Sequence, residues 1–326
     1  MDKVAIIRTD RLGDMVLTLP MARAIKECNP NAKIAMIASS YTEPLLYNNA
    51  YLDNYYFIDK IPLNEIFQQN NFDIAFFPRP KFNEALEAFK NKIPIRIGSA
   101  YRWYSFLFNH KLNIHRKKGD LHEAEYNTLM VAKFYNRIVS TELIAPFIKI
   151  EADQKILGLF EQYQINSNSK IIIIHPGSKG SAKDWHPKNF AKAARILKES
   201  LECEILITGT QEEKESCNII LKECPSAFTF CGLLNLDELI ALISHSNLLI
   251  ANSTGVLHLA SALGIAVLGL YPNTKHIGAG RWGPYSRNSL VISPPITDNK
   301  KAIDDMSLIE VETVVNSALK LLGIRF

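Results

Sequence analysis

Short apolar runs alternate with longer amphipathic stretches along the whole chain. In the first half, apolar runs of strand length predict strands at 4–7, 33–38, 55–58, 73–77 and 95–97. Helical spacing of apolar residues fills several of the intervals. Strands that alternate with helices in this way are typical of right-handed βαβ units, so the pattern predicts a parallel sheet.

The second half repeats the alternation. Strands are predicted at 170–175, 203–208, 227–230, 248–251, 266–271 and 290–293, and helices at 187–201, 211–222, 236–245 and 255–263. Two series of βαβ units predict an α/β protein with two Rossmann-like domains. The polar stretch 161–170 indicates the end of a linker, so we expect domains at 1–160 and 161–326, with a last helix at about 307–322.

Composition favours a globular chain of two domains. The 326 residues are 47% hydrophobic and 21% charged, which suffices for two cores of ordinary size. No Asp, Glu, Lys or Arg occurs in 239–274, but Asn252 and the polar residues after it interrupt this segment, which predicts strand, turn, helix and strand in place of a membrane span. The chain shows no signal-peptide pattern at its start, and its five cysteines suggest reduced thiols, so we expect a cytoplasmic location.

Positive charge gathers in one segment. Residues 79–118 hold ten Lys and Arg against two acids, and five aromatic residues lie between Tyr101 and Phe108. Such a segment indicates an acidic partner, either anionic lipid, a phosphorylated sugar or nucleic acid, unless it is only a solvated face with some buried rings. Nucleic acid is disfavoured because no base-reading motif accompanies the segment and the net charge is only +4.

The turn after the first predicted strand holds an unexpected carboxylate. The sequence RTDRLGDMVLTLP (8–20) contains one glycine, Gly13, followed by Asp14. The three glycines of a dinucleotide-binding turn are missing. From the residues alone, capping of the following helix is the favoured role of Asp14, and Asp10 is a second acid in the same turn.

Two turns of the second half suit an anion. HPGSKGSAKDWHP (175–187) has glycines that permit close backbone approach, and its polar members are Ser178, Lys179, Ser181 and Lys183. It lacks the ending of a P-loop. NSTGVLHLASALG (252–264) predicts a helix whose first amides favour an anion, with ordinary capping by Ser253 or Thr254 as the alternative. Because both turns follow strands of one parallel sheet, together they suggest a bound diphosphate and therefore a nucleotide.

In order and separation these three motifs resemble glycosyltransferase family 9, the lipopolysaccharide heptosyltransferases, over almost the whole chain. The resemblance implies the GT-B architecture, in which the sheets of two Rossmann-like domains face a cleft and the last helix packs back toward the first domain. The acceptor would bind mainly to the first domain and the nucleotide sugar to the second. The implied reaction transfers a sugar, typically heptose from ADP-heptose, with inversion.

The resemblance also implies partners and roles. The acceptor would be an anionic lipid-linked glycan such as the lipopolysaccharide inner core, at the inner face of the cytoplasmic membrane. Asp14 matches the catalytic base, and Lys183 matches the lysine that meets the diphosphate as ADP leaves. The other donor-site positions are Ser178, Gly209, Gly232, Ser253, Thr254, Gly255 and His258. The acceptor-site positions are Arg11, Gly13, Arg79, Arg102 and His122, of which His122 is alternatively an exposed surface residue.

Two features qualify the resemblance. No D-x-D triplet occurs, which fits metal-independent transfer without a cofactor. Ser253 stands where several heptosyltransferases have Asp, which leaves the donor sugar open. The alternatives are a nucleotide-sugar epimerase of the same architecture, for which the basic segment has no task, and a non-catalytic protein of glycan assembly, against which the presence of both Asp14 and Lys183 argues.

Overall fold

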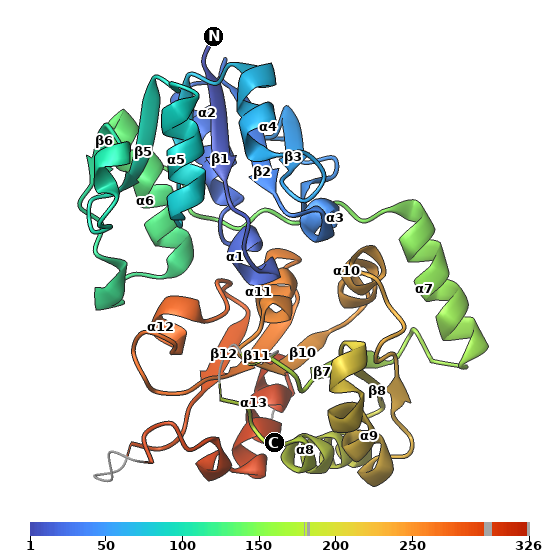
Figure 1. The fold of residues 1–326 in the computed structure, drawn as a ribbon. Coiled ribbons are helices and arrows are strands. Elements are labelled where there is room, and N and C mark those ends of the chain that lie inside the picture. Colours follow the sequence, from blue (N-terminus) through green and yellow to red (C-terminus); the bar gives the residue numbers. More distant parts are fainter. Residues whose placement is uncertain (179, 181–182, 297–301, 325–326) are drawn as a thin grey trace. The chain divides into compact units, whose positions relative to one another are not determined.

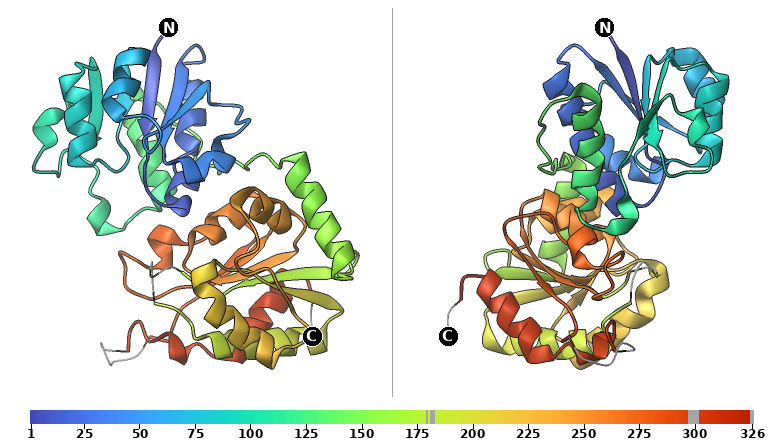
Figure 2. Two further views of the ribbon diagram at one scale, coloured as in Figure 1. Left: turned by 45° about the vertical axis from the view of Figure 1, so that its right-hand side comes forward. Right: turned by 90° about the vertical axis from the view of Figure 1, so that its left-hand side faces the viewer.

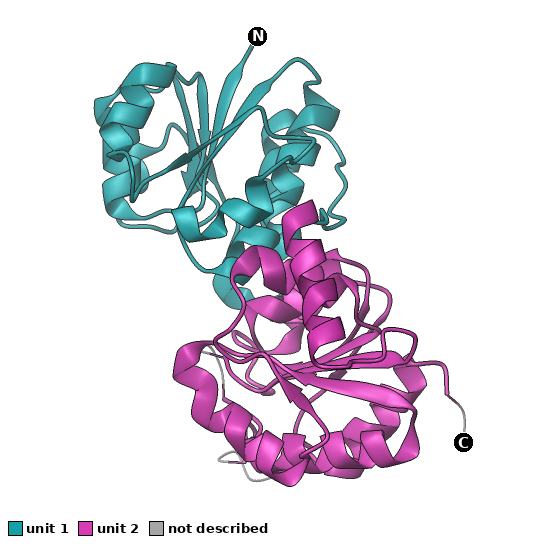
Figure 3. Ribbon diagram, turned by 90° about the vertical axis from the view of Figure 1, so that its right-hand side faces the viewer, with its two compact units in different colours: residues 1–147 teal, residues 148–326 magenta. Residues whose placement is uncertain are grey.

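The computed structural model describes residues 1–178, 180, 183–296 and 302–324. The chain forms two compact units, Met1–Phe147 and Ile148–Phe326 (Figures 1 and 3). Each unit contains one six-stranded sheet in which every pair of neighbouring strands is parallel. The predicted α/β class with two Rossmann-like folds is therefore confirmed.

The sheet of unit 1 has the order β3-β2-β1-β4-β5-β6. Its strands are β1 (Lys3–Ile7), β2 (Lys33–Ala38), β3 (Asn54–Phe57), β4 (Ile74–Phe76), β5 (Ile95–Ser99) and β6 (His110–Leu112). After Lys3, every residue of the central strand β1 is buried, as expected for a parallel strand with helices on both faces. The chain order reverses between β1 and β4, and ligands of such sheets bind at this switch point, beyond the carboxyl ends of the strands.

Helices cover both faces of this sheet (Figure 2). Helix α4 packs beside α5 on one face, and α2 packs beside α6 on the other. Alternate strand residues supply the two cores: Ala5 and Ile7 face the α4–α5 side, whereas Phe76 meets Phe134 of α6 edge-on. The helices are α1 (Leu12–Val16), α2 (Pro20–Cys28), α3 (Glu43–Leu46), α4 (Leu63–Asn70), α5 (Phe82–Lys90) and α6 (Glu123–Tyr135), with 3₁₀ turns at Ser40–Thr42, Ser105–Leu107 and Arg116–Lys118.

The sheet of unit 2 has the order β12-β11-β10-β7-β8-β9, so its switch point lies between β7 and β10. Its strands are β7 (Lys170–His175), β8 (Cys203–Ile207), β9 (Phe228–Thr229), β10 (Leu248–Asn252), β11 (Ala266–Leu270) and β12 (Ser289–Ile292). Strands β10 and β11 are buried along their whole length. The charge-free segment 239–274 therefore contains the strand, turn, helix and strand that its sequence predicts.

Helices α8, α9 and α13 cover one face of the second sheet, and α7, α10 and α11 pack together on the other. These helices are α7 (Ile150–Gln162), α8 (Pro187–Ser200), α9 (Lys214–Glu223), α10 (Leu236–Ser244), α11 (Gly255–Ala262) and α13 (Val311–Leu321), and a short α12 (Ala279–Trp282) follows β11. Two 3₁₀ turns lie at Gln211–Glu213 and Met306–Leu308. Within its own unit, α13 contacts α8 and β11.

The observed division of the chain differs from the expected one. We expect a boundary near residue 160, whereas the units divide after Phe147 because α7 packs on α10 of unit 2. Most of the polar stretch 161–170 therefore follows a helix of unit 2 and leads into β7. All five cysteines are free thiols, and four of them are buried. In the described part of the chain, no helix is both long enough and apolar enough to span a bilayer.

Candidate active site

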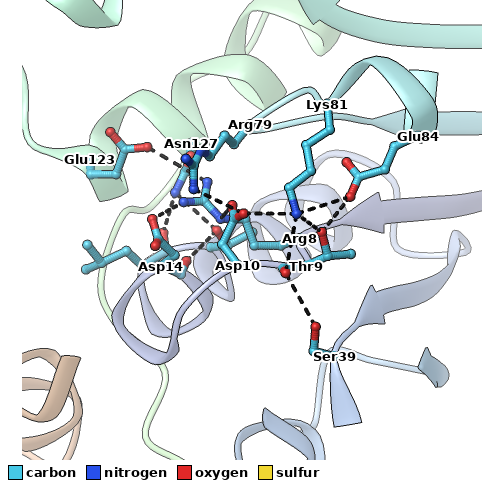
Figure 4. A network of polar contacts seen from close by, with 12 residues as sticks. Arg8, Thr9, Asp10, Asp14, Ser39, Arg79, Lys81, Glu84, Glu123 and Asn127 are labelled. Atoms are coloured by element: carbon cyan, nitrogen blue, oxygen red, sulfur yellow. Dashed lines mark hydrogen bonds and ion pairs between the residues drawn. The ribbon is translucent and has the colours of Figure 1, made fainter. Parts of the chain in front are cut away.

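The turn after β1 places Asp14 in the first turn of α1, at the switch point of the first sheet. Its half-buried carboxylate does not cap the helix, contrary to the role that the residues alone favour. It accepts a hydrogen bond from Nη2 of Arg8 instead (Figure 4). Arg11 is the exposed N-cap residue of α1, and Gly13 is buried beneath the turn.

Arg8 is the buried centre of this group of residues in unit 1. Its side chain is 1% exposed, although it carries a full charge. Nε lies 3.1 Å from Oδ2 of Asp10, and Nη1 lies 3.9 Å from Oε1 of Glu123 on α6. A buried guanidinium is tolerated only when carboxylates compensate its lost hydration, and here three of them do so. Sequence reasoning missed Arg8, although a charged residue at the end of a buried central strand is an available signal.

Asp10, the second acid of the turn, is surrounded by cations. Besides Arg8, the guanidinium of Arg79 lies 3.1 Å from its Oδ1 and the ammonium of Lys81 lies 3.2 Å from the same atom (Figure 4). Arg79, a predicted acceptor residue, is thus brought to the same turn as Asp14. Three cationic partners occupy both oxygens of the Asp10 carboxylate, whereas the ion pair of Asp14 with Arg8 involves Oδ1.

A second carboxyl group lies beside these cations. Lys81 donates to Oγ1 of Thr9 (2.6 Å), which donates to Oε1 of Glu84 (2.5 Å). Burial raises the pKa of Glu84, against the opposing effects of the Thr9 hydrogen bond and the Lys81 charge. Glu84 and Lys81 belong to the site by contact, but no sequence motif identified them.

Two predicted acceptor residues lie elsewhere. His122 is buried, so its alternative as an exposed surface residue is wrong. Its Nδ1 accepts from the amide of Ala124, while Glu125 accepts from the amide of His122, so His122 caps α6 and fixes the start of the helix next to Glu123. Arg102 is exposed and lies between β5 and β6.

In unit 2, Asn252 holds the loop after β7 at both ends. Its Nδ2 donates to the carbonyl of Pro176 (2.6 Å), and its Oδ1 accepts from the amide of Trp185 (2.8 Å). Asn252 and Trp185 are completely buried, and the indole Nε1 donates to the carbonyl of Ile309 (3.0 Å). The loop that carries Ser178 and Lys183 is therefore anchored to the end of β10, although Lys179 and Ser181 lie outside the described residues.

Ser178 and Lys183 of this anchored loop differ in their exposure to solvent. Ser178 is buried. Burial of Asp184 raises the pKa of its carboxyl group, and a hydrogen bond with the Ser178 side chain partly offsets this increase. Lys183 is exposed. Burial raises the pKa of Asp304, but hydrogen bonds from Thr274 and the charge of Lys183 lower it below its usual value, so the ammonium lies near this acid.

Gly209 and Gly232 meet at the end of β8, where the amide of Gly232 donates to the carbonyl of Gly209 (2.9 Å). A Cβ on Gly209 would lie 2.9 Å from the sulfur of Cys217, and Gly232 has a φ of +72°, which favours glycine. Gly177 faces the same corner, because a Cβ there would lie 1.9 Å from Oε1 of Glu213. Side chains at these glycine positions would clash or be strained, so a ligand in this corner would face backbone atoms.

Helix α11 begins directly after β10. Thr254 occupies its N-cap position without a side-chain cap, so the predicted capping by Thr254 is wrong. Gly255 is the first helical residue, and His258 is buried one turn later. Ser253 hydrogen-bonds the buried hydroxyl of Tyr271, which donates in turn to the carbonyl of Trp282 (2.7 Å). Ser253 is thereby connected to the segment after β11.

A family model described as Glycosyltransferase family 9 (heptosyltransferase) matches residues 63–309, which is most of the chain and includes the second and third motifs. The chain belongs to glycosyltransferase family 9. A putative glycosyltransferase of Haemophilus influenzae is 28% identical over 97% of this chain and 95% of its own. Solved structures of a family 9 glycosyltransferase from Veillonella parvula (TM-score 0.87, 19% identity, 99% and 98% coverage) and of ADP-heptose heptosyltransferase II from E. coli (0.80, 20%, 99% and 99%) share the fold.

Membership in family 9 confirms the predicted family and enzyme class, a glycosyltransferase with two Rossmann-like domains. The two groups of polar residues described above each lie at the carboxyl edge of one sheet of this glycosyltransferase. Unit 1 offers carboxylates and cations that can receive a proton and hold an anionic group. Unit 2 offers a glycine-lined corner, an anchored loop with a lysine and a helix start, which suit a phosphorylated ligand.

Proposed function

We propose that this glycosyltransferase moves a sugar from ADP-heptose to the inner core of lipopolysaccharide, with inversion at the anomeric carbon. The donor is suggested by relatives of similar fold: an E. coli heptosyltransferase, WaaC, has been solved with ADP, and a curated E. coli relative 24% identical over 85% of this chain is lipopolysaccharide heptosyltransferase 3. The observation that carries the chemistry is the half-buried carboxylate of Asp14, which follows β1 and pairs with Arg8, in the same turn as Asp10 with its partners Arg79 and Lys81.

In the proposed reaction, an acceptor hydroxyl oxygen forms a bond to the anomeric carbon while the bond from that carbon to the diphosphate oxygen breaks. Oδ1 of Asp14 is engaged by Arg8, so we assign proton uptake from the hydroxyl to Oδ2. The electron pair of the broken bond leaves with ADP. Lys183, the amides at the start of α11 and the Ser178 hydroxyl would stabilise the negative charge that accumulates on the diphosphate, without a metal ion. Gly209 and Gly232 would border the adenosine.

The test is ADP release from ADP-heptose in the presence of inner-core lipopolysaccharide. Asp14→Asn should lower kcat by about 10²–10⁴-fold, whereas the control Asp73→Asn, at the amino end of the same sheet, should not. Lys183→Ala should weaken ADP binding, and Lys188→Ala, an exposed lysine in the first turn of α8, should leave it unchanged. Full transfer by Asp14→Asn would remove the base, and unchanged ADP affinity in Lys183→Ala would remove the diphosphate contact.

Donor identity needs a separate measurement. Several heptosyltransferases have Asp where this chain has Ser253, and a serine can form fewer hydrogen bonds to the hydroxyls of a sugar than a carboxylate can. Binding raises apparent stability by about 2.7 kcal/mol at a hundredfold excess of ligand over Kd. A thermal-shift panel should therefore rank ADP above UDP and GDP. Conversion of a nucleotide sugar incubated without any acceptor would instead favour the epimerase alternative.

We also propose that unit 1 docks the enzyme at the cytoplasmic face of the inner membrane and that Arg79 and Arg102 bind the acceptor. Within the basic segment 79–118, the rings of Tyr101, Trp103 and Phe106 are 56%, 74% and 63% exposed. Exposed rings flanked by cations are suited to an anionic bilayer. Trp103→Ser with Phe106→Ser should abolish flotation with phosphatidylglycerol vesicles, and the control Ile138→Ser, an exposed apolar residue outside the segment, should not. Equal flotation of the double variant and the control would contradict the proposal that Tyr101, Trp103 and Phe106 dock on the membrane.

A further inference from the structure

The Asp14 side chain is held by Arg8, the first residue of the motif 8–20, to which the sequence assigns no role. Arg8 directly follows β1, and its amide still donates to Ile37 of β2 (2.9 Å), so its backbone is part of the sheet. The guanidinium is planar and presents its donors in fixed directions. Nη2 donates a hydrogen bond to Asp14, whereas Nε and Nη1 form ion pairs with Asp10 (3.1 Å) and Glu123 (3.9 Å) (Figure 4). The rigid sheet therefore determines where the Asp14 carboxylate is held.

A closed circuit of polar contacts holds Asp14 from its other side. On α6, Glu123 also pairs with Arg116, whose Nη1 donates to Oδ1 of Asn127 (2.9 Å). The Asn127 amide donates to Oγ1 of Thr18 (3.3 Å), and Thr18 donates to the backbone carbonyl of Asp14 (2.7 Å). Asn127 and Thr18 are completely buried. The circuit thus returns to the backbone of Asp14, whose side chain Arg8 holds.

Asp10 does not depend on Arg8 in the same way. Arg79 and Lys81 would still pair with Asp10 if the guanidinium were removed. In the ion pairs described here, Asp14 has Arg8 as its cationic partner. Loss of the Arg8 guanidinium would therefore release the Asp14 carboxylate, whereas Asp10 would keep its ion pairs with Arg79 and Lys81.

We propose that Arg8 is a positioning residue, which holds Oδ1 of Asp14 so that Oδ2 points to the acceptor hydroxyl; this inference rests on the proposed role of Asp14 as the base. Arg8 itself touches neither the proton in transit nor the sugar. Lysine at the same position keeps the charge, but its single ammonium group cannot reproduce the fixed directions of the guanidinium donors. A misplacement of about 1 Å can cost about 100-fold in rate.

The test measures kcat, the KM of ADP-heptose and folding by thermal melting for Arg8→Lys and Arg8→Gln. We expect kcat to fall by about 10- to 100-fold in Arg8→Lys and further in Arg8→Gln, with the KM of the donor changed less than about twofold. Thr18→Val keeps every charge but opens the circuit, and a lower kcat there supports the inference even if Arg8→Gln fails to fold. The control is Arg23→Lys, which removes the guanidinium of another arginine of unit 1 that contacts Ser140 and Glu142.

A double-mutant cycle separates positioning from a purely structural role. In the Asp14→Asn background, Arg8→Lys should change the residual rate by less than about threefold, because the carboxylate that it positions is gone. Additive losses, or a wild-type kcat in Arg8→Lys, would overturn the inference while Asp14→Asn still removed activity. Full activity of Asp14→Asn alone would instead overturn the proposed base, so the two failures are distinguishable.

Discussion

Replacement of Asn252 by alanine removes the clamp on the loop after β7. The variant loses the hydrogen bonds to Pro176 and Trp185 and leaves a carbonyl and an amide without these partners around a completely buried side chain. Each buried group left unsatisfied costs about 1–3 kcal/mol, so we expect these two to lower the free energy of unfolding by about 2–6 kcal/mol. Since Ser178 and Lys183 lie on this loop, ADP affinity should fall by about tenfold as well.

The matched control is Asn247→Ala. The exposed Asn247 accepts one hydrogen bond, from the amide of Ile171 (2.7 Å), at the amino end of the same sheet. Its loss should cost about 0.5–1.5 kcal/mol and should not affect ADP binding. Urea denaturation followed by circular dichroism measures the first quantity, and isothermal titration with ADP measures the second. If both variants unfold at the same urea concentration and bind ADP like the wild type, Asn252 is not a clamp.

Three further substitutions have defined outcomes. Burial raises the pKa of Asp53, but hydrogen bonds from two lysines and an amide lower it to about 2. The ionised Asp53 carboxylate therefore stabilises the fold above about pH 4, and this effect is lost as the pH falls toward 2. In urea titrations at several pH values, Asp53→Asn should lower the free energy of unfolding by about 1 kcal/mol at pH 7 and by little near pH 2. Gly177→Ala should weaken ADP binding because its Cβ would overlap the Glu213 carboxylate and force that side chain to move, and Glu213→Ala in the same chain should restore binding in the titration. Tyr271→Phe loses the hydrogen bond to Trp282 and should lower the free energy of unfolding by about 1–3 kcal/mol, while an unchanged melt would contradict this.

Most strands were predictable because each is a continuous apolar run between helical stretches. The exceptions are informative. Strand β6 has three residues at the edge of its sheet and is largely exposed, so it has no apolar run to detect. Helix α7 is amphipathic like its neighbours, and only its packing on α10 assigns it to unit 2. The order of strands within each sheet was not predicted, because periodicity does not specify which strands pair.

The turns of the site were predictable for a related reason. The carboxyl ends of parallel strands share one edge, so polar residues that follow such strands converge there. Their supporting contacts were not predictable. Asn127 contacts the carbonyl of Leu17, 110 residues away, and Trp185 contacts Ile309, 124 residues away. Such pairs follow from the packing of α6 on α2 and of α13 on the second sheet, which no local pattern reports.

The two sheets have consequences for synthesis on the ribosome. In the described residues, strands β1 to β6 end at Leu112, and β7 begins only at Lys170, so neither sheet borrows a strand from the other. N-terminal domains generally fold first as the nascent chain emerges. The Arg8 circuit also closes within the first 127 residues. We therefore expect unit 1, with the contacts around Arg8, to be assembled while unit 2 is still being translated.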